Sequence, residues 1–240
     1  MSFSQRFIWT VPVLCAAFIF SSCSRSHEVE EEEVGEEVAE PEEEEIDWLA
    51  PVRPFPAKFA PRETMPDVKE TEASGKNVNS RFSPGRDLIY VDDSRVWWES
   101  DHDGEDDDEC DHSMHRAMEL PFRRLVELCA ASNAQLRVQE VYRPVGTHAT
   151  LSLHKEGRAI DLTCPMLDPQ NPNPERPTAK SLEILCKLAW AAGFDWVYYE
   201  QPRNKYNGPH LHASVRPDGP DFPERLRPVF EPHNQDFESP

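Results

Sequence analysis

The chain has 240 residues, and its 45 acidic against 25 basic side chains give a formal net charge of −20. A single block over residues 28–47, with twelve Glu and one Asp as its only charged residues, supplies 13 of the negative charges. The rest of the chain is mildly acidic and has no basic stripe, which argues against a nucleic-acid-binding protein. This length suffices for one ordinary domain and additional segments.

The first 23 residues have the pattern of a bacterial export signal. Arg6 is followed by an uncharged apolar run over residues 7–20, too short to span a bilayer, and then by two serines and Cys23. A Cys directly after small residues resembles a lipobox, whose Cys carries the lipid of the mature protein. We expect a protein of the bacterial cell envelope anchored to a membrane through Cys23, on the periplasmic side or at the cell surface. An ordinary cleaved signal peptide and an uncleaved anchor are the alternatives.

A disordered tether is predicted over residues 24–80. Its acidic block repels itself and has little apolar surface to bury. The stretch "APVRPFPAKFAPRETMP", residues 50–66, is Pro-rich and favours a partly polyproline conformation. We expect folded structure to begin between Phe82 and Leu88, which leaves about 140 residues for the domain, enough for one sizeable core. The domain is assigned to residues 81–228 and a C-terminal tail to residues 229–240.

The first half of this domain contains a helix pattern and a strand pattern. Met114, Met118 and Cys129 recur at helical spacing, with Asp111 as a plausible N-cap, and Pro121 is expected to kink or divide the helix. The stretch "QLRVQEVY" then alternates with period two and predicts a strand, in which Glu140 interrupts an otherwise apolar face.

The second half contains one helix and two strands. "TAKSLEILCKLAWAAG" has a Thr cap at Thr178, apolar residues at helical spacing and a stop at Gly193. "FDWVYYE" and "HLHASV" are rich in aromatic and β-branched residues and predict two strands. Taken together, the elements predict an α+β domain with helices packed on an antiparallel or mixed sheet.

The cysteines left after the export signal contain no CxxC pair, which argues against a cysteine zinc site. Disulfides and buried free thiols are both compatible with their spacing in an oxidising compartment. These cysteines are Cys110, Cys129, Cys164 and Cys186.

Potential metal ligands occur on two segments. His154 and Asp161 lie in "LHKEGRAID", and His210 and His212 share one face of the strand "HLHASV". Two His and one Asp would supply three ligands and leave the fourth tetrahedral position for water, as in catalytic zinc sites. Zinc makes such a water acidic, and a hydrolase also needs a carboxylate to take its proton. Glu200, at the end of "WVYYE", is the nearest candidate; a solvated Glu is the alternative.

The segments "SLHKEGRAIDL", "AAGFDWVYYE" and "HLHASV", in this order and spacing, resemble the zinc-bearing half of the hedgehog N-terminal signalling domain. More broadly, they resemble the fold that hedgehog shares with zinc D-Ala-D-Ala peptidases. The resemblance covers residues 87–215 and implies a hedgehog/DD-peptidase-like fold with a zinc site. It implies that His154, Asp161 and His212 bind Zn²⁺, that Glu200 stands beside the metal-bound water, and that His210 and His148 surround that water.

Hedgehog domains also bind calcium, and here the sequence departs from the family. Glu140 matches one calcium ligand, but Arg143 and Val145 stand at two further ligand positions and neither can coordinate Ca²⁺. The acidic segment "DHDGEDDDECDH" is present. A weak Ca²⁺ site in it is one interpretation, because closely spaced carboxylates are hard oxygen ligands, but we favour a solvated acidic loop. The candidate ligands are Asp101, Asp103, Asp106 and Asp108.

Arg143 suggests catalysis instead. "VYRP" before the pattern SxHxxGxAxD resembles the "YR" element of the zinc peptidases, whose Arg faces the substrate and the developing oxyanion. An ordinary surface Arg with an ion-pair partner is the alternative. Gly157, inside the same pattern, is expected to allow a tight loop between the ligands.

We therefore predict an exported zinc peptidase, of the D,D- or L,D-peptidase type, that acts on peptidoglycan peptides through Glu200. The first alternative is a non-catalytic zinc-stabilised module that binds an envelope protein. A lipoprotein spacer with an incidental domain is a second alternative, but it leaves the converging polar residues unexplained.

Overall fold

A computed structural model gives the fold of residues 47–78, 81–99, 111–144, 151–201 and 208–218. All of these belong to one compact unit, Glu44–Pro240. The predicted export signal with Cys23, most of the acidic block, the candidate calcium loop and the C-terminal tail lie outside the described residues, as do Cys110, Val145 and His148.

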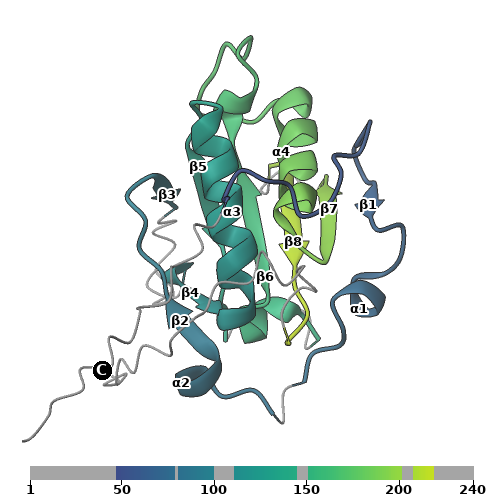
Figure 1. The fold of residues 1–240 in the computed structure, drawn as a ribbon, viewed down its shortest axis with the longest axis vertical. Helices are drawn as coiled ribbons and strands as arrows, with labels where there is room; N and C mark the ends of the chain where they lie inside the picture. The colour runs from purple at the N-terminus through teal and green to yellow at the C-terminus, as the bar shows by residue number, and fades with distance from the viewer. Residues whose placement is uncertain (1–46, 79–80, 100–110, 145–150, 202–207, 219–240) are drawn as a thin grey trace, which may run out of the picture. The chain divides into compact units, whose positions relative to one another are not determined.

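A six-stranded sheet with the order β1-β7-β8-β6-β5-β3 forms the centre of the domain (Figure 1). Neighbouring strands are antiparallel except for β3 and β5, which are parallel, so the sheet is mixed, one of the two forms that the sequence left open. A separate two-stranded sheet joins β2 and β4. The strands are β1 (Thr64–Met65), β2 (Leu88–Tyr90), β3 (Val96–Trp98), β4 (Ser113–His115), β5 (Leu136–Glu140), β6 (Ala159–Thr163), β7 (Trp196–Glu200) and β8 (His210–Ser214).

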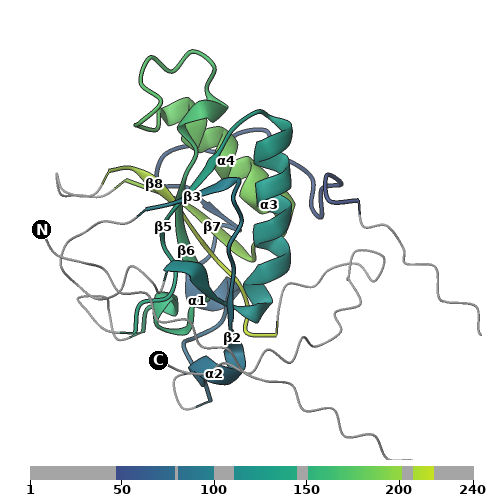
Figure 2. The same cartoon turned by 90° about the vertical axis from the view of Figure 1, so that its left-hand side faces the viewer.

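Two long helices, α3 (Glu119–Ala131) and α4 (Ala179–Ala192), pack against each other and cover one face of the sheet (Figures 1 and 2). Their apolar sides and the facing side chains of the strands form one core, which confirms the α+β prediction. No helix within the described ranges has both the length and the apolarity to cross a bilayer. The short helices are α1 (Glu70–Ala73), α2 (Pro84–Asp87) and the 3₁₀ turns η2 (Arg116–Met118), η3 (Leu153–Glu156) and η4 (Pro165–Leu167).

The start of the first long helix differs from the sequence prediction. Asp111 is not its N-cap, because residues 113–115 pair with β2 as a strand and α3 begins only at Glu119. Met114 is nevertheless fully buried, so its helical spacing from Met118 arises without a helix. Pro121 lies in the first turn of α3, where a missing backbone N–H removes no helical hydrogen bond. It therefore neither kinks nor divides the helix.

The helix α4 agrees with its prediction at both ends. Thr178 Oγ1 accepts a hydrogen bond from Ser181 N at 3.0 Å, and Ser181 Oγ accepts one from Thr178 N at 2.9 Å. This reciprocal cap satisfies two backbone donors at the start of the helix. Gly193 ends the helix in the left-handed region, with φ 109°.

The expectation of a tether through residue 80 is wrong for residues 47–78. Thr64 pairs with Tyr198 at the edge of the sheet, and Phe59 is 2% exposed within the core. The Arg53 guanidinium lies 4.4 Å from the centre of the Trp190 ring. The Pro-rich composition suggested an extended linker. In the structure, however, side chains of this stretch such as Phe59 and Arg53 have specific partners on the domain.

Three of the four cysteines in question are buried free thiols, which decides between the two alternatives for Cys129, Cys164 and Cys186. Burial raises the pKa of the Cys186 thiol well above its usual value. This thiol therefore has little thiolate character and behaves as an apolar core residue.

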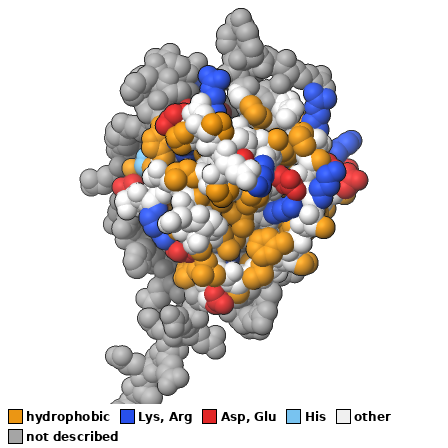
Figure 3. Space-filling model, turned by 90° about the horizontal axis from the view of Figure 1, so that it is seen from above, with side chains coloured by type: hydrophobic (Ala, Val, Ile, Leu, Met, Phe, Trp, Pro, Cys, Tyr) orange, Lys and Arg blue, Asp and Glu red, His pale blue; other side chains and the backbone are white. Residues whose placement is uncertain are grey.

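On the face seen in Figure 3, apolar side chains occupy much of the middle, and basic and acidic side chains lie among them and toward the rim. Among the described residues of this face, basic and acidic side chains lie near one another. Met166, in η4, is one of the large apolar side chains that are exposed in the described structure, at 51%.

Gly157 leaves no room for a side chain. It ends η3 with φ 62°, and a Cβ at this position would lie 2.8 Å from Leu88 Cδ2 and 2.9 Å from His115 N. We expect Gly157→Ala to lower the free energy of unfolding by about 2 kcal/mol or more, through left-handed strain and the clash. Gly85→Ala is the control, because its Cβ would meet nothing within 4 Å. Urea denaturation measures both, and equal stabilities would contradict this account.

Candidate metal centre

The candidate centre begins with a row of paired residues across the sheet. Glu140 on β5 pairs with Asp161 on β6, which pairs with His212 on β8. Paired residues of antiparallel strands point to the same side, so Asp161 and His212 share a face. Their neighbours on β8, Leu211 and Ala213, are fully buried in the core on the opposite face, as the alternation predicted. The polar row therefore lies on the face away from α3 and α4.

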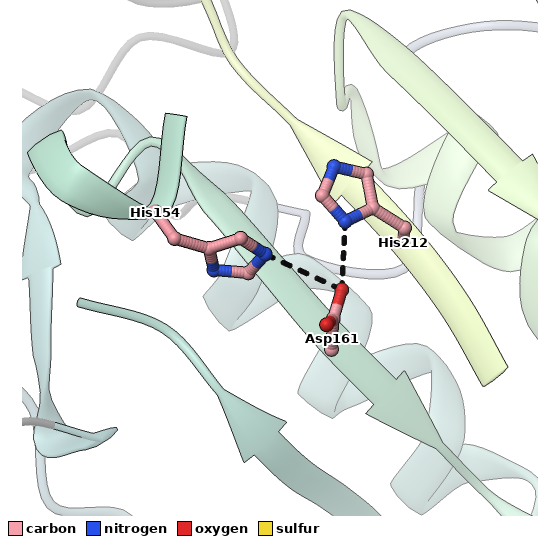
Figure 4. Close-up of side chains that lie close together, drawn as sticks. All are labelled: His154, Asp161 and His212. Atoms are coloured by element: carbon pink, nitrogen blue, oxygen red, sulfur yellow. Dashed lines mark hydrogen bonds and ion pairs between the residues drawn. The ribbon is translucent and has the colours of Figure 1, made fainter. Parts of the chain in front are cut away.

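His154 reaches this row from η3, just before β6. Ser152 Oγ accepts a hydrogen bond from His154 N at 3.3 Å, and Gly157 ends the turn in the left-handed region. His154 Nδ1 lies 2.8 Å from the Val141 carbonyl oxygen. In a neutral ring the proton is therefore on Nδ1, and the Nε2 lone pair points toward Asp161 Oδ1 at 3.5 Å (Figure 4).

His212 is held from both sides of its ring. Its Nδ1 lies 2.7 Å from Asp161 Oδ1, and its Nε2 lies 2.9 Å from a carboxylate oxygen of Glu70, on α1 (Figure 4 shows the first contact). A ligand atom from each of His154, Asp161 and His212 lies within 4.8 Å of the other two. Two imidazoles and one carboxylate are a donor set that zinc accepts, so these residues fit a zinc ion.

The charges in this cluster are strongly coupled. Burial raises the pKa of Asp161, but the charges of His154 and His212 outweigh burial and hold it well below its usual value. Burial lowers the pKa of both histidines, but Asp161 outweighs it, so the pKa of His154 is raised and that of His212, also paired with Glu70, is raised well above normal. A metal ion must therefore displace protons from the imidazoles in order to bind.

Glu200 and His210 form a second pair beside the cluster. They face each other in the register of β7 and β8, and His210 Nε2 lies 3.6 Å from Glu200 Oε2 and 3.6 Å from Asp161 Oδ2. Burial lowers the pKa of His210, but Glu200 and Asp161 raise it to about 9. The hydrogen bond to His210 lowers the pKa of Glu200. Near neutral pH Glu200 is ionised and His210 protonated, and the Glu200 side chain is 37% exposed.

Arg143 lies at the edge of the same region. Its backbone N–H donates to the His154 carbonyl oxygen at 3.0 Å, and its Nη1 lies 3.6 Å from Glu140 Oε2. The ion-pair partner expected for a surface Arg is therefore present, although the side chain is only 17% exposed. Glu140, which the sequence resemblance matched to a calcium-ligand position, has the Arg143 guanidinium as a counter-ion. His148 and the four candidate calcium ligands lie outside the described residues.

Glu70 is the site residue that the sequence reasoning missed. It lies in the stretch assigned to the tether, where acidic residues are common, and a four-residue helix is too short to give a periodic signal. Only the pairing of β1 with β7 and the docking of α1 bring it to His212. The two segments singled out by the sequence do meet, and they bring together His154, Asp161, His210 and His212. Glu200, from the end of β7, joins them through His210.

Comparison with known proteins gives a family match over most of the domain. The sequence model of the family described as the hedgehog amino-terminal signalling domain matches residues 56–214, which is 159 of the 240 residues. This match begins inside the stretch that sequence analysis assigned to the tether.

Curated relatives match over a shorter part. Indian hedgehog B protein of Danio rerio and Indian hedgehog protein of Gallus gallus are each 39% identical over 82 residues, which covers 34% of this chain and 16% of the relative. Sonic hedgehog protein of Xenopus laevis is 40% identical over 82 residues, covering 34% of this chain and 15% of the relative. The matched part of the chain thus spans about a sixth of these relatives.

We expect zinc to bind the metal-free protein one to one and to release protons, because the pKa values of His154 and His212 are raised in the metal-free cluster. The apparent affinity should therefore rise with pH until both imidazoles are unprotonated. Isothermal titration calorimetry in buffers of different ionisation enthalpy counts the protons. Asp161→Asn should weaken binding at least about 100-fold, since loss of an outer partner alone costs 10- to 100-fold. Exposed Asp67→Asn is the control, and equal affinities of the two variants would refute this site.

Proposed function

The chain belongs to the hedgehog amino-terminal signalling domain family, and from this premise we propose that it is a zinc peptidase of the bacterial cell envelope. The family's fold is related to that of zinc peptidases. The observation that carries the proposal is the pair Glu200 and His210, whose side chains lie 3.6 Å apart at the candidate metal cluster. An ionised carboxylate beside a protonated imidazole offers a base and a cation at one place.

His154, Asp161 and His212 would hold the zinc ion. Bound zinc would polarise a substrate carbonyl and make a water molecule more acidic. The polar side chains around the cluster then have to move the proton and balance the charge.

Glu200 is proposed as the base that takes a proton from the attacking water. Its lowered pKa keeps it ionised at neutral pH, and its partial exposure lets a substrate approach. As the water oxygen bonds to the carbonyl carbon, the N–H of His210 can stabilise the negative charge that develops on the carbonyl oxygen. When the C–N bond breaks, the proton held by Glu200 passes to the leaving nitrogen, which gives a carboxylic acid and an amine.

Arg143 is proposed to bind a carboxylate of the substrate or the developing oxyanion. A guanidinium presents fixed donors in a planar fork, which suits a carboxylate. The hydrogen bond from Arg143 N to the His154 carbonyl oxygen ties its backbone to a metal ligand. His148 is proposed as a further polar residue around the water on the basis of the family resemblance.

Peptidoglycan peptides are the proposed substrate, and membrane anchoring through Cys23 would bring the enzyme to them. Two features of the sequence support this: the export signal with its lipobox-like Cys, and the acidic block that follows and would act as a spacer.

A non-catalytic module is the second candidate function. The matched family is described as a signalling domain, and zinc bound at a buried charge cluster would stabilise the fold without turnover. Such a module would bind an envelope protein through its surface and would not need Glu200.

Glu200→Gln separates the two functions. Zinc-loaded full-length protein in detergent is expected to trim peptidoglycan peptides, and Glu200→Gln should lower the rate by about 10²- to 10⁴-fold, because the amide cannot take a proton. Its zinc affinity should stay within a few-fold of the wild type. Mass spectrometry of the peptides measures turnover, and Glu175→Gln, whose carboxylate is 74% exposed, is the control. Intact peptides with the wild type at several pH values and metal loadings would contradict catalysis and favour the binding module.

A further inference from the structure

The short helix α1 is held on the sheet by contacts that do not involve Glu70. A helix of four residues is not stable alone, so its position depends on these partners. Three side chains of the domain donate to carbonyl oxygens on either side of it or within it, and one pair of buried hydroxyls joins it to β8. The contacts are Trp196 Nε1 to Val68 O at 2.9 Å, Arg216 Nε to Ala73 O at 2.8 Å, Arg158 Nη1 to Ser74 O at 2.8 Å, and Ser74 Oγ with Ser214 Oγ at 2.8 Å.

Arg158 makes this docking rigid. Its side chain is fully buried, forms an ion pair with Glu156 at 2.8 Å, and donates a further hydrogen bond to the Lys76 carbonyl oxygen. A buried guanidinium whose donors are used in this way has a strong preference for one geometry. The segment from Val68 to Lys76 is therefore fixed relative to β6 and β8, which carry Asp161 and His212.

The docked helix directs one carboxylate at the cluster. Glu70 Oε1 lies 2.9 Å from His212 Nε2, and the Glu70 side chain is 25% exposed. An ionised carboxylate only accepts hydrogen bonds, so His212 Nε2 must carry a hydrogen. Asp161 Oδ1 lies 2.7 Å from Nδ1, so this nitrogen also carries a hydrogen when no metal is bound. Because Glu70 keeps the hydrogen on Nε2, Nδ1 is the nitrogen that gives up its proton to a metal ion. The Val141 carbonyl oxygen acts in the same way on His154. It keeps a hydrogen on Nδ1, so Nε2 is the nitrogen whose lone pair can bind a metal ion.

We propose that Glu70 is a positioning residue of the metal centre, which holds His212 in the tautomer and orientation that present Nδ1 to the metal. This inference rests on the proposed binding of zinc by the three ligands. It makes the segment before residue 80 part of the site and gives the docking of α1 a functional consequence. A carboxylate on the outer nitrogen of a metal-binding imidazole also raises the basicity of the ligand.

Zinc affinity is the first test, because it does not depend on the reaction. We expect Glu70→Ala to weaken zinc binding by 10- to 100-fold, the usual effect of losing such a partner. Glu70→Gln should lose less, since its amide oxygen can still accept from Nε2 without the charge. Glu72→Ala, an exposed carboxylate on the same turn, is the matched control and should stay within about two-fold of the wild type. Competition with a chromogenic zinc chelator on the full-length protein measures all four.

The tautomer of His212 is the second test, and a merely structural role of Glu70 would not affect it. Long-range ¹H–¹⁵N spectra of the zinc-loaded wild type should show His212 with its hydrogen on Nε2 and the metal on Nδ1. Glu70→Gln, which preserves size and docking, keeps this measurement possible if Glu70→Ala does not fold. Zinc on Nε2 would overturn the inference.

The outcomes distinguish this inference from the proposed function. If the wild type does not take up zinc, the metal centre and the role of Glu70 both fail. If the wild type binds zinc and Glu70→Ala binds it as tightly as Glu72→Ala, the role of Glu70 alone fails. Loss of affinity in Glu70→Ala with an unchanged Glu72→Ala supports the inference, whether or not the protein hydrolyses peptides.

Discussion

The arrangement of the site depends on the carboxylate of Asp161 in the middle of the sheet. A charge in such a position is costly unless it is paired and hydrogen-bonded. One of its oxygens lies 2.7 Å from His212 Nδ1 and 3.5 Å from His154 Nε2, and the other lies 3.6 Å from His210 Nε2. The other ring nitrogen of each imidazole contacts a second acceptor, which is Val141 O for His154, Glu70 for His212 and Gly208 O for His210. The charge of Asp161 is thus balanced by three imidazoles that are each held in one orientation.

One face of the sheet stabilises the fold, and the other carries the residues of the candidate metal centre. Leu211, Ala213 and their neighbours pack under α3 and α4 and keep β6 and β8 in register. That register sets Asp161 opposite His212 on the other face, where η3 supplies one candidate ligand and α1 supplies the carboxylate that contacts His212. Membership in the hedgehog family fits this division, because the match runs through the segments on both faces.

Much of this arrangement could be predicted where the signal was local. The alternation in "HLHASV" assigned His210 and His212 to one face, and the caps of α4 marked both of its ends. Glu70 could not be found, because its position depends on contacts with Arg158, Trp196 and Arg216 far along the chain. The start of α3 was missed for the same reason: pairing with β2, a non-local contact, makes residues 113–115 a strand despite their helical spacing.

We propose His154, Asp161 and His212 as a zinc site in which the outer nitrogens of both imidazoles are already hydrogen-bonded. Zinc K-edge X-ray absorption of the full-length protein loaded with one equivalent of zinc tests it most directly. We expect a four-coordinate ion with two imidazole nitrogens at about 2.0–2.1 Å and oxygen ligands at about 2.0–2.2 Å. A six-coordinate shell of oxygens alone, or a shell that contains sulfur, would contradict it.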